Sequence, residues 1–369
     1  DDSSEVQNTI SWALDPDATS YTVYWDNAPG VTDASSVVVP RAQGARYVIH
    51  SDVDVVAGST YYYRVQATSA DGDSNLSAEV AGTPQRSITN NQLNDVAWNG
   101  VDTLVAVGDS GVILASPNGT ADAWTDVAAP NVPVSLEGVT WESVNSQFLI
   151  VGASDTVLTG DGATWTEENL GNLDGSRNLK DAAWLGDRYI AVGNNGAIIT
   201  SNIDGSLWTL QDAGAALANT SLNAVAYDTG RIVVVGTNGT ILSSVDGVAW
   251  EVQAPPLNND LNDITWDGSQ FVVVGSNDTI LTSNDGLAWT QHIPGTSDIN
   301  FVAVTHWDSG LPATPVVAAV GSAGTFVVGP HNDPGLIVRT GTTRQLGGLA
   351  QVDPGAYFVI TGSDGTVLT

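Results

Sequence analysis

The stretch that decides the fold is Ser283–Thr290, SNDGLAWT, in which an aspartate precedes a glycine and a tryptophan follows four residues later. Such an aspartate serves either a chemical site or a turn that positions the tryptophan. Recurrence separates the two readings, because a catalytic carboxylate needs no equivalents along the chain. Close copies of the stretch are TGDGATWT from Thr159, SNIDGSLWT from Ser201, SVDGVAWE from Ser244 and SPNGTADAWT from Ser116.

The aspartates of these copies, Asp161, Asp204, Asp246 and Asp285, occupy one equivalent place, so we predict a structural role for all of them. An aspartate at such a place accepts hydrogen bonds from backbone N–H groups of the turn while the glycine takes a positive φ. We expect the tryptophan to begin a strand and to pack its ring between neighbouring units, with its N–H left to find a partner.

Each copy belongs to a longer unit that recurs at intervals of 38 to 47 residues, which is the range of propeller blades. The unit opens on a half-apolar strand, continues with a second strand ending in Val-Gly or a close variant, and turns tightly into a third. The opening lines are LNDVAW at Leu93, LEGVTW at Leu136, LKDAAW at Leu179, LNAVAY at Leu222, LNDITW at Leu261, INFVAV at Ile299 and LGGLAQ at Leu346. At the tight turn we expect positive φ, which suits Gly111, Asp155, Gly196, Gly239, Asp278, Gly324 and Gly365.

Seven units of four short antiparallel strands predict a seven-bladed β-propeller over residues 85–369. The last unit ends at DGTVLT without a fourth strand. We expect Arg86 to Thr89 to supply that strand and to lock the last blade to the first; a continuation of the chain beyond Thr369 is the alternative.

The closing motif resembles the Asp-box, or bacterial neuraminidase repeat, in a shortened form. The whole repeat region resembles the propellers of the photosystem II assembly factor family, through the VG, G-I-S and DG-W positions of each unit. That resemblance implies a non-catalytic propeller that contacts a protein or assembles a surface complex. Asp-box propellers serve enzymes and receptors alike, so the function needs its own evidence.

Residues 1–84 alternate apolar and polar positions without any helical period, which predicts an antiparallel β-sandwich. The segment resembles a bacterial fibronectin type III domain, on Trp12, on YTVYWDNAPGV from Tyr21, and on GSTYYYRVQA with Tyr61 at the tyrosine-corner place. The resemblance implies a spacer or adhesion module. The aromatic residues Trp25, Tyr62 and Tyr63 form either a sugar-stacking surface or core and cross-strand pairs.

The charge is extreme, with 41 acidic residues against 10 basic ones and a formal net charge of −31. Such a surface repels phosphate backbones and anionic lipid, which argues against nucleic-acid and membrane-surface binding. The acidity serves solubility in a salty medium, cation binding, or attraction of a basic partner. There is no cysteine, which excludes a disulfide framework and a thiolate metal site, and no methionine, which indicates a processed or truncated chain. Because Thr, Ser, Asn and Asp are abundant and there is one lysine, we expect an exported chain with its signal removed, located outside the cell, on its surface or in a periplasm.

One position of the opening strand is a candidate cation site. Asp95, Asp181 and Asp263 share it in units one, three and five, and we align Gly138, Ala224, Phe301 and Gly348 with it in the others. Three carboxylates near a propeller axis suit a hard cation such as Ca²⁺. The alternative is that each accepts backbone hydrogen bonds from a neighbouring blade.

The position before it holds Lys180, the only lysine, which we expect to neutralise acids at the channel mouth and which is also a candidate ligand contact; Asn300 is aligned with the same place. The insertion THWDSGLPATP, Thr305 to Pro315, makes His306 and Trp307 candidate ligand contacts on an irregular loop.

No catalytic motif stands out. The four histidines are scattered, no arginine cluster of the sialidase kind is present, and no nucleophile elbow or phosphate loop occurs. A pair of aspartates for glycoside hydrolysis stays open. We therefore expect a monomeric, non-catalytic interaction protein with a protein or polysaccharide partner and no cofactor; a lectin-like protein is the first alternative and a glycoside hydrolase the second.

Overall fold

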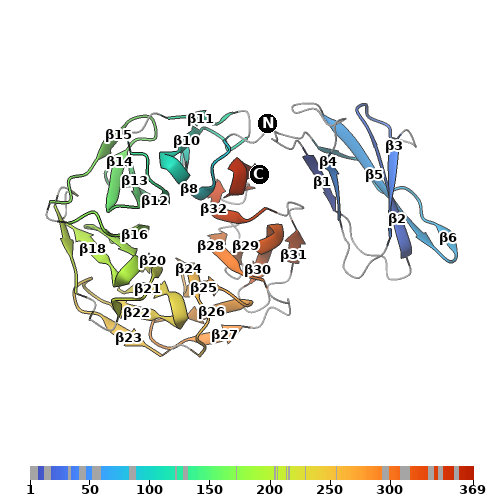
Figure 1. Ribbon diagram of the computed structural model, residues 1–369. Coiled ribbons are helices and arrows are strands. Elements are labelled where there is room, and N and C mark those ends of the chain that lie inside the picture. The colour runs from blue at the N-terminus through green and yellow to red at the C-terminus, as the bar shows by residue number, and fades with distance from the viewer. Residues whose placement is uncertain are drawn as a thin grey trace. The chain divides into compact units, whose positions relative to one another are not determined.

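The computed structural model describes residues 7–11, 18–31, 35–40, 47–51, 60–82, 89–120, 123–127, 132–171, 173–202, 205, 207–212, 214, 217–228, 230–254, 256–292, 299–307, 316–330, 336–339, 344–352 and 357–369. The chain is all-β and divides into two compact units, residues 1–87 with 339–343 and residues 88–338 with 344–369 (Figure 1). In the described part of the chain, no helix is long and apolar enough to span a bilayer.

The first unit contains two antiparallel sheets. One sheet pairs β1 (Gln7–Ser11) with β4 (Tyr47–Ser51), and the other has the order β3 (Ser35–Pro40), β2 (Ala18–Asp26), β5 (Tyr61–Ser69), β6 (Gly72–Asp73), with β7 (Val80–Gly82) also paired to β5. Tyr21, Val23 and Tyr63 are buried in its core. These strands match the alternating runs of the sequence, while Trp12 lies outside the described residues.

Two of the three aromatic residues singled out in the first unit lie opposite each other on neighbouring strands. Trp25 lies opposite Tyr63, and Asp26 lies opposite Tyr62, in the register of β2 and β5. Tyr63 is only 2% exposed, so it has no face to offer a sugar. The cross-strand reading of Trp25 and Tyr63 is therefore confirmed.

The second unit is a ring of small antiparallel sheets, each taking consecutive strands from inside to outside (Figure 1). In the described residues six of these sheets have four strands and one, formed by the last three strands, has three. The innermost strands carry the opening lines: β8 (Leu93–Trp98), β12 (Leu136–Glu142), β16 (Leu179–Trp184), β20 (Leu222–Tyr227), β24 (Leu261–Trp266), β28 (Phe301–Trp307) and β32 (Leu346–Val352).

The second strands are almost wholly apolar, because both of their faces are covered by neighbouring sheets. They are β9 (Leu104–Gly108), β13 (Gln147–Gly152), β17 (Tyr189–Gly193), β21 (Ile232–Gly236), β25 (Phe271–Gly275), β29 (Val316–Gly321) and β33 (Tyr357–Gly362). The third strands are β10 (Ile113–Ser116), β14 (Thr156–Gly160), β18 (Ile198–Ser201), β22 (Ile241–Ser244), β26 (Thr279–Ser283), β30 (Thr325–Pro330) and β34 (Thr366–Leu368).

The outer strands are short, as expected for exposed sheet edges. They are β11 (Thr125–Asp126), β15 (Trp165–Glu167), β19 (Trp208–Leu210), β23 (Glu251–Gln253), β27 (Thr290–His292) and β31 (Leu336–Arg339). The predicted closing strand at Arg86 to Thr89 falls on residues of which only Thr89 is described.

The tight turn between second and third strands has the backbone that the sequence predicted. All seven predicted positions have a positive φ, from +57° at Asp155 to +77° at Gly111, and the residue before each is also left-handed. Two consecutive left-handed residues define the hairpin turn whose twist matches antiparallel strands. In five units a short 3₁₀ turn covers this corner: η1 (Asp109–Gly111), η3 (Asn194–Gly196), η5 (Thr237–Gly239), η6 (Ser322–Gly324) and η7 (Ser363–Gly365).

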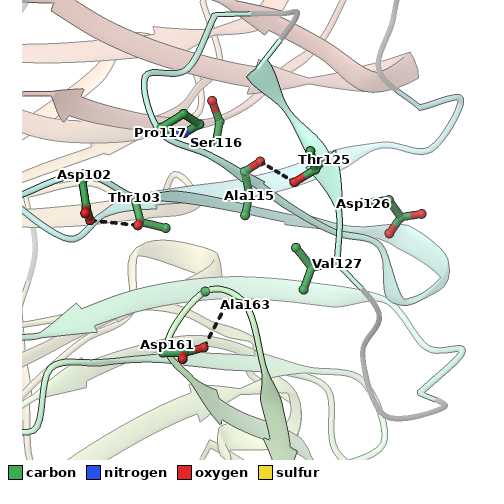
Figure 2. Close-up of a pocket in the computed structure, with 11 residues that line it drawn as sticks. Asp102, Thr103, Ala115, Ser116, Pro117, Thr125, Asp126, Val127, Asp161 and Ala163 are labelled. Atoms are coloured by element: carbon green, nitrogen blue, oxygen red, sulfur yellow. Dashed lines mark hydrogen bonds between the residues drawn. The ribbon is translucent and has the colours of Figure 1, made fainter.

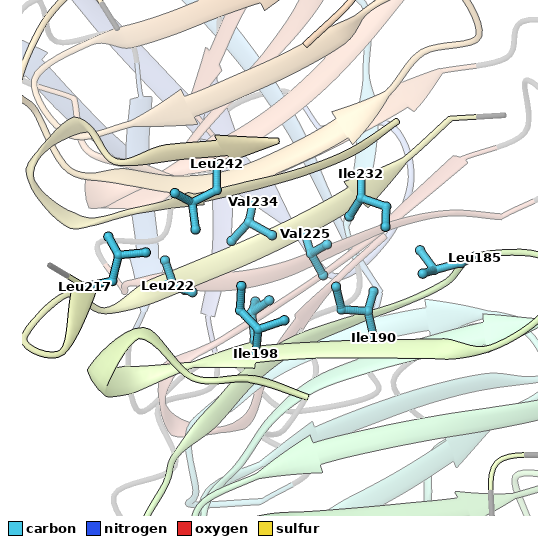
Figure 3. Packing of buried hydrophobic residues seen from close by; sticks show 10 residues of the cluster. Leu185, Ile190, Ile198, Leu217, Leu222, Val225, Ile232, Val234 and Leu242 are labelled. Carbon is cyan, nitrogen blue, oxygen red and sulfur yellow. The ribbon is translucent and has the colours of Figure 1, made fainter. Parts of the chain in front are cut away.

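The core of the ring lies between sheets. Seven apolar clusters each combine side chains of two neighbouring sheets. In one of them Ile190 and Ile198 point toward Val234 and Leu242 of the next sheet (Figure 3). Another joins Leu93 and Leu104 of the first sheet to Val352 and Val359 of the last, and β32 lies beside β8. The ring of sheets is therefore closed.

The Asp-Gly stretch makes the predicted turn. Asp285 Oδ1 accepts the N–H groups of Leu287 and Ala288 at 2.9 and 3.1 Å, and Gly286 has a φ of +68°. Asp161 and Asp246 make the same bonds in their own units, while Asp204 lies outside the described residues. The structural role is confirmed where the turn is described.

The tryptophan after each turn packs between sheets, as predicted. Trp165, Trp208, Trp250 and Trp289 each join the apolar cluster shared with the preceding sheet, and Trp124 joins the cluster that closes the ring. The Trp124 N–H donates to the Gly119 carbonyl at 3.0 Å. The indole N–H groups of the other four make no hydrogen bond within the described structure.

The sixth opening strand corrects the sequence alignment. Phe301, not Ile299, pairs with the glycine that ends the second strand, as Leu93 pairs with Gly108 in the first unit. Ala303 rather than Phe301 therefore takes the place of Asp95, and Val302 rather than Asn300 the place before it. A bulge interrupts each inner strand directly after its first paired residue, and sequence spacing alone does not reveal its register.

Candidate functional site

The three aligned aspartates lie on the inner strands of the first, third and fifth sheets. Each of them connects its own sheet to the sheet that follows. Each accepts one N–H from the following residue of its own strand and one from the next sheet. The donors from the next sheet are Val139 to Asp95 at 2.8 Å, Val225 to Asp181 at 2.8 Å and Val304 to Asp263 at 2.7 Å. The predicted alternative, in which these carboxylates accept backbone hydrogen bonds from a neighbouring sheet, is confirmed.

Small residues make these bridges possible. The residue before each bridging N–H is Gly138, Ala224 or Ala303, in the sheet that follows each aspartate. At Gly138 an added Cβ meets the Lys180 carbonyl oxygen at 2.6 Å, so the next inner strand passes directly against it. Acidic and small residues therefore alternate around the inner ring, and the aspartates link the first six sheets in pairs.

Burial of these carboxyl groups changes their acidity. Desolvation raises the pKa of Asp95 to about 7 and that of Asp181 to about 6, against the opposing effect of the backbone N–H bonds. Burial also raises the pKa of Asp263 well above its ordinary value, and repulsion from Asp181 and Asp95 adds to that rise. Burial therefore makes all three carboxyl groups hold their protons to a higher pH than an exposed aspartate.

The three aspartates line one cavity of about 420 Å³ at the centre of the ring, together with Tyr227, Trp266 and other inner-strand residues. Within the described chain no group of three acidic or histidine side chains is placed to hold a metal ion. The carboxylate oxygens are instead engaged by N–H donors, so the Ca²⁺ site at Asp95, Asp181 and Asp263 stays a prediction without a ligand set to support it.

One end of the inner ring is built from the bulge positions. Asn94, Asn223 and Asn262 each donate from the side-chain amide to the carbonyl of the first inner-strand residue in the next sheet, at 2.9, 2.8 and 2.6 Å. Lys180 takes the same place and donates to Asn223 Oδ1 at 2.9 Å. Burial lowers the pKa of Lys180, while Glu137 and Asp260 act in the opposite direction. Lys180 therefore stands close enough to two acids to offset part of their charge.

The opposite end is formed by the last position of each opening line. Trp98, Trp141, Trp184, Tyr227 and Trp266 are half-buried there, His306 is exposed, and the last sheet places Gln351 at the same register. We call these seven residues the aromatic mouth. An aromatic residue closes five of the opening lines in the sequence, and this repetition was the signal that could have predicted the site.

Two of the candidate contacts change place. His306 and Trp307 lie at the end of strand β28 and not on the irregular insertion, because that strand begins its pairing at Phe301, two residues after Ile299. His306 thereby joins the aromatic mouth. The rest of the insertion, residues 308–315, lies outside the described residues.

A second hollow lies between the first two sheets, with a volume of about 480 Å³ (Figure 2). Asp102, Asp126 and Asp161 line it. Asp161 is held by its own turn, and Asp102 accepts from Asn99 Nδ2 and Thr103 Oγ1 at 3.0 Å each. Two of its three carboxylates thus serve local turns, and the hollow offers no convergent set of groups for a reaction.

The geometry of the ring agrees with comparisons to known structures. YCF48 bound to D1 peptide has a TM-score of 0.59 and 17% identity, over 76% of this chain and 91% of that one. YCF48 from Cyanidioschyzon merolae gives a TM-score of 0.59 and 17% identity, over 76% and 95%. The computationally designed Ika8 protein gives a TM-score of 0.55 and 12% identity, over 82% and 92%.

These likenesses place the second unit among β-propellers and support a propeller that resembles the photosystem II assembly factor family. At such identities they establish the fold alone. No protein-family model and no curated protein matches the chain.

Proposed function

We propose that this chain is a non-catalytic interaction protein whose propeller binds a protein partner and holds it in a larger assembly. The observation that carries the proposal is the likeness in fold to a propeller, YCF48, whose structure holds a D1 peptide. The engagement of the channel aspartates by backbone N–H groups supports a binding role over a catalytic one.

The finer parts of the proposal rest on the sequence. The seven repeats favour seven blades with Asp-box turns, and the first 84 residues favour a fibronectin type III module that acts as a spacer. The net charge of −31 favours a monomeric protein. The many Thr, Ser, Asn and Asp residues and the single lysine favour an exported one, outside the cell, on its surface or in a periplasm.

Affinity capture with the full chain as bait tests the proposal. Excess free chain should displace one genuine partner, and the partner purified separately should rebuild a stoichiometric complex in analytical ultracentrifugation. A bait that retains only proteins indifferent to free chain, with no complex rebuilt, contradicts a protein-binding role.

A carbohydrate-binding function is the second candidate, because the half-buried tryptophans of the aromatic mouth are also suited to stacking on sugar rings. Retention on a broad glycan array, with the eluates checked for released sugar, distinguishes it. Specific retention without release supports a lectin, and release of sugar supports the hydrolase alternative.

A further inference from the structure

Three tryptophan rings of the aromatic mouth each pack against a buried aromatic ring of the same sheet. Trp141 packs on Phe148, Trp184 on Tyr189 and Trp266 on Phe271, with ring centroids 4.6, 4.6 and 4.8 Å apart. Each partner ring belongs to the second strand of the same sheet and is buried. These three tryptophan rings are thus held in place before any ligand binds, which lowers the entropic cost of binding.

The mouth opens on two cavities that share lining residues. Trp98, Trp141 and His306 line a cavity of about 590 Å³, and Tyr227 and Trp266 line the central cavity of about 420 Å³. Val96, Val139, Thr140, Thr305, His306 and Leu349 line both. Aromatic side chains therefore border a continuous hollow that leads to the three half-buried aspartates.

The loops at this end of the ring carry mostly negative charge. In an antiparallel sheet the loop after the first strand and the turn after the third lie at the same end. The described residues of these segments include seven aspartates and only two arginines. The aspartates are Asp102, Asp161, Asp187, Asp228, Asp246, Asp267 and Asp285, and the arginines are Arg188 and Arg231. Arg188 is itself paired with Asp187 at 2.9 Å.

We propose that the aromatic mouth binds a basic segment of a partner protein, with a lysine or arginine side chain seated among its rings and directed toward the channel aspartates. This inference rests on the proposed function and names the chemistry of the partner. A cation is attracted to the face of a tryptophan or tyrosine ring, and more strongly where water is excluded. The surrounding carboxylates favour a cationic segment over an acidic one.

Calorimetric titration of the full chain with hexalysine tests the proposal, with hexaglutamate and hexaserine as matched peptides. We expect hexalysine alone to bind. Two variants, Trp141→Leu and Trp266→Leu, keep an apolar side chain against the core but remove the ring, and each should weaken binding at least tenfold.

A substitution at an exposed residue tests the same site with less risk of disturbing the fold. His306→Lys places a competing cation in the mouth and should also weaken hexalysine at least tenfold, whereas Gln291→Lys, on the exposed outer strand, adds the same charge and should change affinity less than twofold. Thermal unfolding checks that every variant is folded.

Equal affinities in all four variants and the unaltered chain overturn the proposal, because they assign the binding to overall acidity. Absence of hexalysine binding, or retention of cellohexaose or chitohexaose in its place, overturns it as well. A captured partner that binds the tryptophan variants as well as the unaltered chain removes this inference and leaves the proposed function intact.

Discussion

At the scale of single residues, the aspartates of this chain divide by environment. Those of the Asp-Gly turns are largely exposed and are held as carboxylates, since backbone N–H bonds lower the pKa of Asp246 and Asp285. Those of the channel are desolvated, and their pKa values rise. Recurrence in the sequence predicted the first role. The second needed the structure, because burial and the bridging donors come from other sheets.

The turn aspartates stabilise the fold through their hydrogen bonds, which gives a residue-scale prediction. Asp285→Ala removes the acceptor of two turn N–H groups and should lower the Tm by about 1–3 °C. Asp126→Ala, at an exposed position of an outer strand, is the matched control and should leave the Tm within about 1 °C. Scanning calorimetry of both variants compares them; equal shifts would show that the turn bonds contribute nothing.

At the scale of elements, the strand order followed from the sequence and the register did not. Period-two patterning, Val-Gly endings and turn residues predicted the strands of each unit. In β28 the first paired position is taken by Phe301, whose buried ring fills the place that leucine takes elsewhere. With this register His306 lies on β28 at the aromatic mouth and not on the predicted loop. The error in the predicted register is the reason why the sequence did not place His306 in this site.

The inner strands should make stability depend on pH in a specific direction. Folding raises the pKa of the channel aspartates, so the folded state binds more protons between about pH 4 and pH 7. Their contribution favours the folded state at low pH and is lost as pH rises through the folded pKa values. We expect the free energy of unfolding to fall between pH 5 and pH 8.

Asp181→Asn isolates this effect from the repulsion of the other surface charges. Between pH 5 and pH 8 the free energy of unfolding should fall by about 1 kcal/mol less in the variant than in the unaltered chain, because the variant lacks one of the three titrating groups. Urea unfolding at the two pH values measures the difference. Identical falls in both proteins would mean that Asp181 has the same pKa folded and unfolded.

At the scale of the whole molecule, closure of the ring creates the site. No single sheet has a channel or a mouth; both arise because β32 returns beside β8 and the seven residues of the aromatic mouth lie at the same end of the inner strands. The close approach is tight, since a Cβ at Gly348 would meet the Asp95 Cα at 2.6 Å. Sequence repeats predicted the ring, while the hollow leading inward depends on side chains from several sheets at once.

Binding of a basic segment at the aromatic mouth is tested most directly by hydrogen–deuterium exchange of the full chain with and without hexalysine, followed by mass spectrometry. We predict slower exchange in the segments that surround the aromatic mouth, 97–104, 140–148 and 183–190, with no change in the outer strands β15, β19, β23 and β27. Protection confined to the outer strands, spread evenly over the chain, or absent altogether would contradict a binding site at the mouth of the channel.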